Sequence, residues 1–128
     1  MAVDLATNER VAIKIMNEKE GEDCRHKQYD SKLLKLFLNE IEMCLKAHHR
    51  GVIQITDFQV GGVYRSPDGH ARRILYYVMK FASYGELHRL VKDSEMFSEK
   101  LARMIFRKLI LTVEHLHGAG VSHRDIKA

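Results

Sequence analysis

The first part of the chain contains a stretch whose side chains alternate in character, as those of a β-strand do. Residues 9–16 are rich in β-branched side chains, and positions two apart share a face of the strand. The two faces carry Val11, Ile13 and Ile15 on one side and Ala12, Lys14 and Met16 on the other. The pattern therefore predicts a strand with one charged side chain, Lys14, among small and apolar neighbours.

Two further strands are predicted over residues 52–60 and 73–81, which are again rich in β-branched and aromatic side chains. Between them lie Gly61-Gly62 and the segment Ser66-Pro67-Asp68-Gly69. Glycine and the Pro-Asp-Gly combination are typical of turns. We therefore expect an antiparallel hairpin with an extended loop.

The segment between the first two strands divides into a loop and a helix. Residues 17–30 are polar and irregular, which favours a connecting loop. Residues 31–48 have the periodicity of an amphipathic helix, with Asp30 or Ser31 suited to its N-terminus. Gly51 is the expected end of this helix.

Helical patterns dominate the end of the chain. A short helix is predicted from Glu86, and a long one from about residue 99 to 117. Ser98 suits the N-cap of the long helix, and Gly118 or Gly120 suits its C-terminus. Because strands come first and helices follow, we predict an α+β fold with two lobes that meet near residue 82.

Composition and charge exclude several classes of protein. The 128 residues carry 21 lysines and arginines against 17 acidic residues, and no basic stripe accompanies this net charge of +4. A nucleic-acid partner is therefore not expected. The longest apolar run, residues 74–79, is too short to span a membrane. Cys24 and Cys44 form no CxxC pair, which fits a reducing, cytoplasmic location.

The helix predicted from residue 31 carries a carboxylate on its apolar face. At 100° per residue, one broad arc holds Met43, Leu36, Leu33, Cys44, Phe37, Ile41, Leu34, Leu45 and Leu38. Glu40 falls inside this arc, whereas Glu42 falls on the polar side. A carboxylate on a packing face costs several kcal/mol unless it finds a cation.

Lys14 is the best partner for Glu40, because it too lies on a face of small and apolar side chains. Two opposite charges in such positions are best explained by pairing with each other. The alternative is that Glu40 lies at the edge of the arc and reaches water. The pairing predicts a nitrogen–oxygen distance within about 4 Å.

Two short motifs give the chain a resemblance to protein kinases. Val11-Ala12-Ile13-Lys14 and, near the end, His123-Arg124-Asp125-Ile126-Lys127 are similar to the V-A-I-K and H-R-D signatures of that family. In the family, the strand lysine pairs with a glutamate of the next helix and holds the α- and β-phosphates of ATP. The resemblance therefore assigns these roles to Lys14 and Glu40.

The same resemblance implies an adenine site. Residues 74–87 are similar to the last small-lobe strand, the hinge and the following helix of kinases. The resemblance makes Met79 the gatekeeper behind the adenine and Ala12 its roof. It implies hydrogen bonds to the adenine edge from the Lys80 carbonyl and the Ala82 amide. Glu86 would lie near the ribose hydroxyls.

The resemblance also assigns the residues of the catalytic loop. Asp125 would orient the substrate hydroxyl and accept its proton, and Lys127 would neutralise charge on the transferred phosphoryl group. Lysine at the latter position is the pattern of serine/threonine kinases. Arg124 would meet a phosphorylated or acidic activation loop, and His123 would brace the loop backbone.

We therefore interpret the chain as part of a serine/threonine kinase domain similar to calcium/calmodulin-dependent and AMP-activated kinases. Residues 1–82 would form a partial small lobe and hinge, and residues 83–128 the start of the large lobe. ATP, Mg²⁺, a protein substrate and a regulatory subunit or domain are the implied partners. The metal-binding asparagine and the DFG aspartate would follow residue 128, so no metal ligand is expected within the chain, and the chain alone is expected to be inactive. A non-catalytic interaction module is the open alternative.

Overall fold

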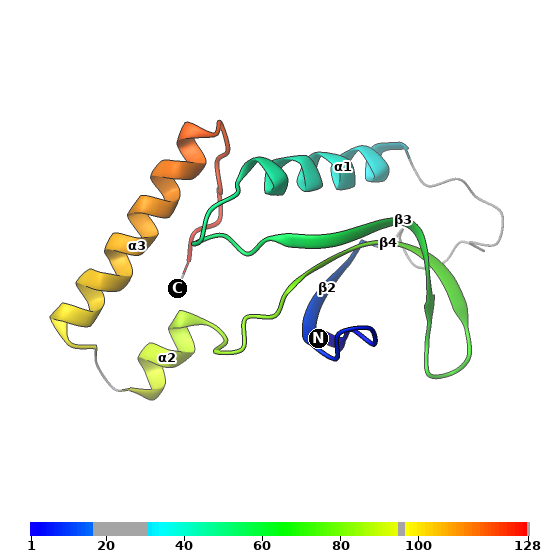
Figure 1. Cartoon of the computed structure of the whole chain (residues 1–128), viewed down its shortest axis with the longest axis horizontal. Coiled ribbons are helices and arrows are strands. Elements are labelled where there is room, and N and C mark those ends of the chain that lie inside the picture. Colours follow the sequence, from blue (N-terminus) through cyan, green and yellow to red (C-terminus); the bar gives the residue numbers. More distant parts are fainter. Residues whose placement is uncertain (17–30, 95–96, 128) are drawn as a thin grey trace. The chain divides into compact units, whose positions relative to one another are not determined.

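The structure is a computed structural model that describes residues 1–16, 31–94 and 97–127 (Figure 1). The loop predicted over residues 17–30 therefore lies outside the described residues, as do Cys24 and the Asp30 cap. The elements, in chain order, are β1 (Ala2–Val3), β2 (Arg10–Met16), α1 (Ser31–Lys46), β3 (Ile55–Arg65), β4 (Ala71–Lys80), α2 (Leu87–Asp93) and α3 (Glu99–Gly118).

The chain divides into two compact units. One comprises Met1–Leu45 and Gln54–Phe81, and the other comprises Lys46–Ile53 and Ala82–Ala128. Among the described residues, the first unit holds the four strands and α1 up to Leu45, and the second holds α2 and α3. None of the described helices is long and apolar enough to cross a lipid bilayer.

The four strands of the first unit form one antiparallel sheet in the order β1-β2-β4-β3. Helix α1 packs along this sheet (Figure 1), and the core lies between them. Phe37 and Ile41 of α1 and Leu75 and Tyr77 of β4 are the buried residues of this core. The predicted strand over residues 9–16 is confirmed as β2.

The burial on α1 is narrower than the predicted apolar arc. Phe37 and Ile41 are buried, whereas four other members of the arc, Leu36, Leu38, Met43 and Leu45, are between 39% and 58% exposed. A single sheet covers only one strip of a helix surface, so the outer members of a broad arc stay in water. The helix ends at Lys46, two residues before the predicted end near His48 and five before the expected stop at Gly51.

The glycine at position 51 is explained by close packing and not by the end of α1. A Cβ atom at this residue would overlap the side chain of Thr112 of α3 in the second unit. Nearby, the imidazole rings of His49 and His115 stack with centroids 4.8 Å apart. Gly51 therefore allows close packing of the segment after α1 against α3, instead of ending the helix.

The hairpin of β3 and β4 corrects one sequence prediction. Gly61 and Gly62 were expected in the loop, but they lie inside β3, where the register with β4 shifts between Val60 and Gly62. Gly61 has a φ of +88°, which a bulge needs and glycine adopts readily. The turn itself spans Ser66 to His70, where the Ser66 amide donates to the His70 carbonyl at 2.9 Å.

The short strand β1 was not predicted. It pairs with β2 through Ala2 with Val11 and Val3 with Arg10. The turn between them is closed by the Asp4 amide, which donates to the Glu9 carbonyl at 2.9 Å. Two residues give too short a pattern for periodicity to detect.

The ends of α3 follow the sequence prediction closely. The Ser98 hydroxyl accepts a hydrogen bond from the Leu101 amide at 3.3 Å, as an N-cap does. Gly120 has a φ of +72°, and the Val121 amide donates to the Leu116 carbonyl at 2.8 Å. This is the Schellman arrangement, so the glycine that terminates α3 is Gly120, two residues after the last helical residue, Gly118.

Candidate functional site

The centre of the candidate site is an ion pair between β2 and α1. Lys14 Nζ lies 2.5 Å from Glu40 Oε1, which confirms the predicted pairing. The side chains are 48% and 33% exposed, so the pair lies at the edge of the core rather than inside it. Glu42 is exposed on another part of α1. The helix register therefore selects Glu40, as the angular pattern predicted.

Packing of α1 explains why Glu40 reaches Lys14. Phe37 precedes Glu40 by three residues, on nearly the same side of the helix, and is fully buried. Its ring centroid lies 6.3 Å from that of Tyr77 and 6.5 Å from that of Phe58. These aromatic contacts fix the rotation of α1 on the sheet, and this rotation turns the Glu40 carboxylate toward β2.

A third member of this cluster, Tyr77 of β4, was not predicted from the sequence. Its hydroxyl donates a hydrogen bond to Glu40 Oε1 at 2.8 Å, and only 4% of the residue is exposed. Tyr77 is directly opposite Lys14 in the antiparallel register, and Lys14 Nζ lies 5.5 Å from the centre of its ring. The signal in the sequence was a tyrosine two residues before Met79, on the same strand face.

Burial and hydrogen bonding compete in setting the pKa values of the cluster. Burial disfavours the charged form of Glu40, but the hydrogen bonds from Lys14 and Tyr77 outweigh it and lower the carboxyl pKa. Burial likewise disfavours the charge on Lys14, but the interactions with Glu40 and Tyr77 together outweigh it, so the pKa of the ammonium is raised. Burial and the bond to Glu40 raise the pKa of Tyr77 to about 12. At neutral pH the three groups are an ammonium, a carboxylate and a neutral phenol.

Two of the residues assigned to the adenine site are neighbours in the sheet. Ala12 pairs with Met79 in the register of β2 with β4, and Val11 pairs with Lys80. Met79 packs against the core cluster, and Lys80 is exposed. The adenine contacts assigned to these residues stay predictions.

The segment after β4 is not helical. Phe81 and Ala82 have no regular structure, and a turn follows in which the Gly85 amide donates to the Ala82 carbonyl at 3.2 Å. A continuous helix over residues 79–84 would have contradicted the predicted hinge, and β4 reaches Lys80 instead. Glu86 is the N-cap residue of α2, and its side chain makes no capping hydrogen bond. The hinge role and the ribose contact of Glu86 stay predictions.

The residues of the H-R-D segment lie in an irregular loop after α3. Lys127 Nζ is 3.0 Å from Asp125 Oδ2, and both side chains are more than 70% exposed. The Asp125 amide donates to His123 Nδ1 at 3.3 Å, so the imidazole does contact the loop backbone. Arg124 has a φ of +62°, an uncommon conformation for a residue with a side chain. The loop thus brings an accepting carboxylate and an ammonium together.

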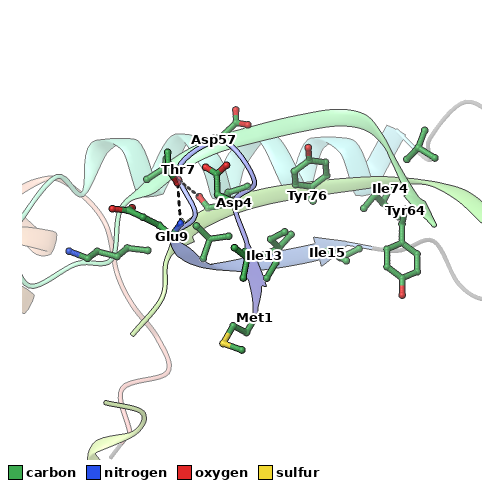
Figure 2. Close-up of a pocket in the computed structure, with 17 residues that line it drawn as sticks. Met1, Asp4, Thr7, Glu9, Ile13, Ile15, Asp57, Tyr64, Ile74 and Tyr76 are labelled. Carbon is green, nitrogen blue, oxygen red and sulfur yellow. Dashed lines mark hydrogen bonds between the residues drawn. The ribbon is translucent and has the colours of Figure 1, made fainter. Parts of the chain in front are cut away.

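A cavity of about 830 Å³ lies on the face of the sheet opposite to α1 and the Lys14–Glu40 ion pair (Figure 2). Ile13 and Ile15 of β2 and Tyr76 of β4 line it, together with the turn that carries Asp4 and Glu9. Lys14 and Ala12 point to the other face of β2, as their positions in the strand require. This cavity is therefore separate from the Lys14–Glu40–Tyr77 cluster.

The sequence of the whole chain matches a known protein family. The protein kinase domain matches the chain over residues 1–128. The chain belongs to the protein kinase family. Its first unit corresponds to part of a kinase small lobe, with α1 on the antiparallel sheet, and the helices of the second unit to the start of the large lobe. The resemblance deduced from the two motifs is thereby confirmed.

Several curated kinases are similar to this kinase chain along nearly its whole length. CBL-interacting protein kinase 30 of Oryza sativa subsp. japonica is 33% identical over 126 residues, which are 98% of this chain and 23% of the relative. Serine/threonine-protein kinase PKH3 of Eremothecium gossypii is 32% identical over 127 residues, or 98% of this chain and 15% of the relative. The chain thus spans a quarter or less of these relatives. No solved structure matches the chain significantly.

Proposed function

We propose that the protein transfers the γ-phosphate of ATP to serine or threonine hydroxyls of other proteins. The observation that carries the proposal is the Lys14–Glu40 ion pair, because it joins the lysine of a V-A-I-K strand to the helix that follows. The similarity to serine/threonine-protein kinase PKH3 supports serine and threonine as the residues that accept the phosphate. Lys127, which follows the H-R-D motif, supports the same specificity.

Each residue has a defined part in the proposed transfer. Lys14 binds the α- and β-phosphates, and Glu40 fixes the position of its ammonium. The substrate hydroxyl oxygen forms a bond to the γ-phosphorus while the bond to the β-phosphate oxygen breaks, which leaves ADP. The hydroxyl proton passes to the Asp125 carboxylate. Lys127, 3.0 Å from Asp125 in the structure, neutralises charge on the phosphoryl group.

Protein kinases use Mg²⁺ with ATP, and the metal neutralises phosphate charge in the transfer. Among residues 1–16, 31–94 and 97–127, no group of three or more histidine, cysteine or acidic side chains is arranged to hold a metal ion. We therefore assign no described residue to Mg²⁺. The inactivity of the 128 residues on their own and the cytoplasmic location both stay predictions.

Radiolabelled ATP with a generic protein substrate tests the proposal in the full-length protein. We expect phosphoserine and phosphothreonine in the product, and a fall in turnover of about 10²-fold or more in Asp125→Asn. Asp93→Asn is the matched control, because Asp93 lies on α2 and pairs with Arg89 on the surface. The proposal fails if the Asp125 variant keeps its activity. Wild-type protein without turnover that still binds a protein partner would support the non-catalytic interaction module instead.

A further inference from the structure

The hydroxyl of Tyr77 is a polar group on a buried strand position, and its partner is the glutamate of the ion pair. Tyr77 is one of the buried core residues in the described part of the chain, and its ring packs beside Phe37. A phenylalanine would fill this space equally well. The hydroxyl therefore contributes something other than packing, and its bond to Glu40 Oε1 at 2.8 Å shows what it contacts.

The two donors of the cluster share one oxygen atom. Lys14 Nζ and the Tyr77 hydroxyl both lie within 2.8 Å of Glu40 Oε1. They come from neighbouring strands, since Lys14 and Tyr77 are register partners of β2 and β4. The carboxylate of α1 is thus held by two points of the sheet, one charged and one neutral.

The Tyr77 hydroxyl and the Lys14 ammonium respond differently to a phosphate that approaches the cluster. An ammonium attracts any phosphate that comes near, so a bound nucleotide competes with Glu40 for Lys14. A phenol that is protonated at neutral pH has no such charge, and the pKa of Tyr77 lies far above this range. We therefore expect the bond from Tyr77 to Glu40 to persist when Lys14 divides its hydrogen bonds between the carboxylate and a phosphate.

We propose that Tyr77 is a positioning residue, whose hydroxyl holds Glu40 against the sheet so that Lys14 stays aligned for phosphate. This rests on the proposed kinase function. In this proposal β4 supports the ion pair through Tyr77, in addition to β2 and α1, which carry Lys14 and Glu40. Tyr77 itself does not contact the reacting atoms.

A double-mutant cycle in the full-length protein tests the role of the hydroxyl. Tyr77→Phe keeps the ring and removes one hydrogen bond to a charged group, so we expect kcat/KM to fall about tenfold. Tyr76→Phe is the matched control, because Tyr76 lines the cavity on the other face of the sheet, and we expect it to change kcat/KM less than about twofold. In a Glu40→Ala background, Tyr77→Phe should have almost no further effect. An equal loss in both backgrounds, or no loss in either, would overturn the proposal.

A spectroscopic measurement separates this proposal from the kinase assignment. Fluorotyrosine is placed at position 77 of the full-length protein, and its ¹⁹F resonance is followed against pH. Because the bond to Glu40 raises the pKa of the phenol, Glu40→Ala should lower the titration midpoint. An unchanged midpoint would show that the hydroxyl does not bind Glu40, whatever the activity. A shifted midpoint in a protein without turnover would uphold the contact and refute only the kinase function.

Discussion

Replacing Lys14 by methionine separates the catalytic value of the ion pair from its structural value. The substitution keeps an unbranched side chain of similar length on β2 and removes the ammonium that contacts Glu40 at 2.5 Å. The lysine side chain is 48% exposed, and solvent screens a pair at this depth. Glu40 also keeps its bond from Tyr77. We therefore expect a loss of stability of about 1 kcal/mol or less.

The expected effect on activity is much larger. If Lys14 binds the phosphates of ATP, loss of this positive charge should lower kcat/KM by about 10²-fold or more, as for other preorganised donors. Hydrogen exchange followed by mass spectrometry on peptides of β2 and α1 measures the stability, and the ATP assay measures the activity. Lys35→Met is the control, because Lys35 is exposed on α1. A stability loss above about 3 kcal/mol would show a structural bridge instead, and undiminished activity would refute the catalytic assignment.

Two other predictions concern the packing and the charge of the same cluster. Phe37→Ala should lower the free energy of unfolding by about 3–5 kcal/mol, because Phe37 is fully buried. Leu36 is 53% exposed, so Leu36→Ala should lower it by about 1 kcal/mol or less. Equal losses in denaturant unfolding would contradict the described core. The folded pKa of Glu40 is lowered, so its stabilising contribution is present above the ordinary glutamate range and is lost as pH falls through the folded pKa. The difference in unfolding free energy between wild type and Glu40→Gln should therefore shrink as pH falls from about 7 to about 3, and a difference that grows would show the opposite shift.

The ion pair could be predicted from the sequence because two local patterns pointed to it independently. Lys14 disturbs the alternation of a strand, and Glu40 disturbs the apolar arc of a helix. Each pattern depends only on the geometry of its own element. The pairing itself then follows from the cost of leaving either charge alone on a packing face.

The third member of the cluster could not be found in the same way. Tyr76 and Tyr77 are adjacent, and they point to opposite faces of β4. Which of them faces α1 depends on the register of β4 with β2, and a strand displaced by one residue would exchange them. The register is set by contacts between residues far apart in the sequence, such as Lys14 and Tyr77, which are 63 residues apart, so the sequence of β4 alone does not determine it.

Glycine was misinterpreted for a related reason. The pair Gly61-Gly62 has the composition of a turn, but a bulge inside a strand requires the same positive φ. At Gly62 a Cβ atom would also overlap the ring of Tyr76 on the neighbouring strand. The glycine pair indicates a positive φ, but the sequence alone does not show whether this residue lies in a turn or in a bulge. Pairing with the neighbouring strand determines which of the two forms.

The partial exposure of the ion pair accounts both for its small expected contribution to stability and for its proposed chemistry. A pair buried in the core would be inaccessible to phosphate, and a pair fully in water would hold its geometry poorly. At 48% and 33% exposure, the Lys14 and Glu40 side chains lie between these limits. Such a pair gains little from its own attraction, so its geometry must come from its surroundings. Buried Phe37 sets the rotation of α1, and the Tyr77 hydroxyl restrains the carboxylate from the sheet side. The core thus fixes the geometry of the ion pair, while the Lys14 side chain stays accessible from solvent.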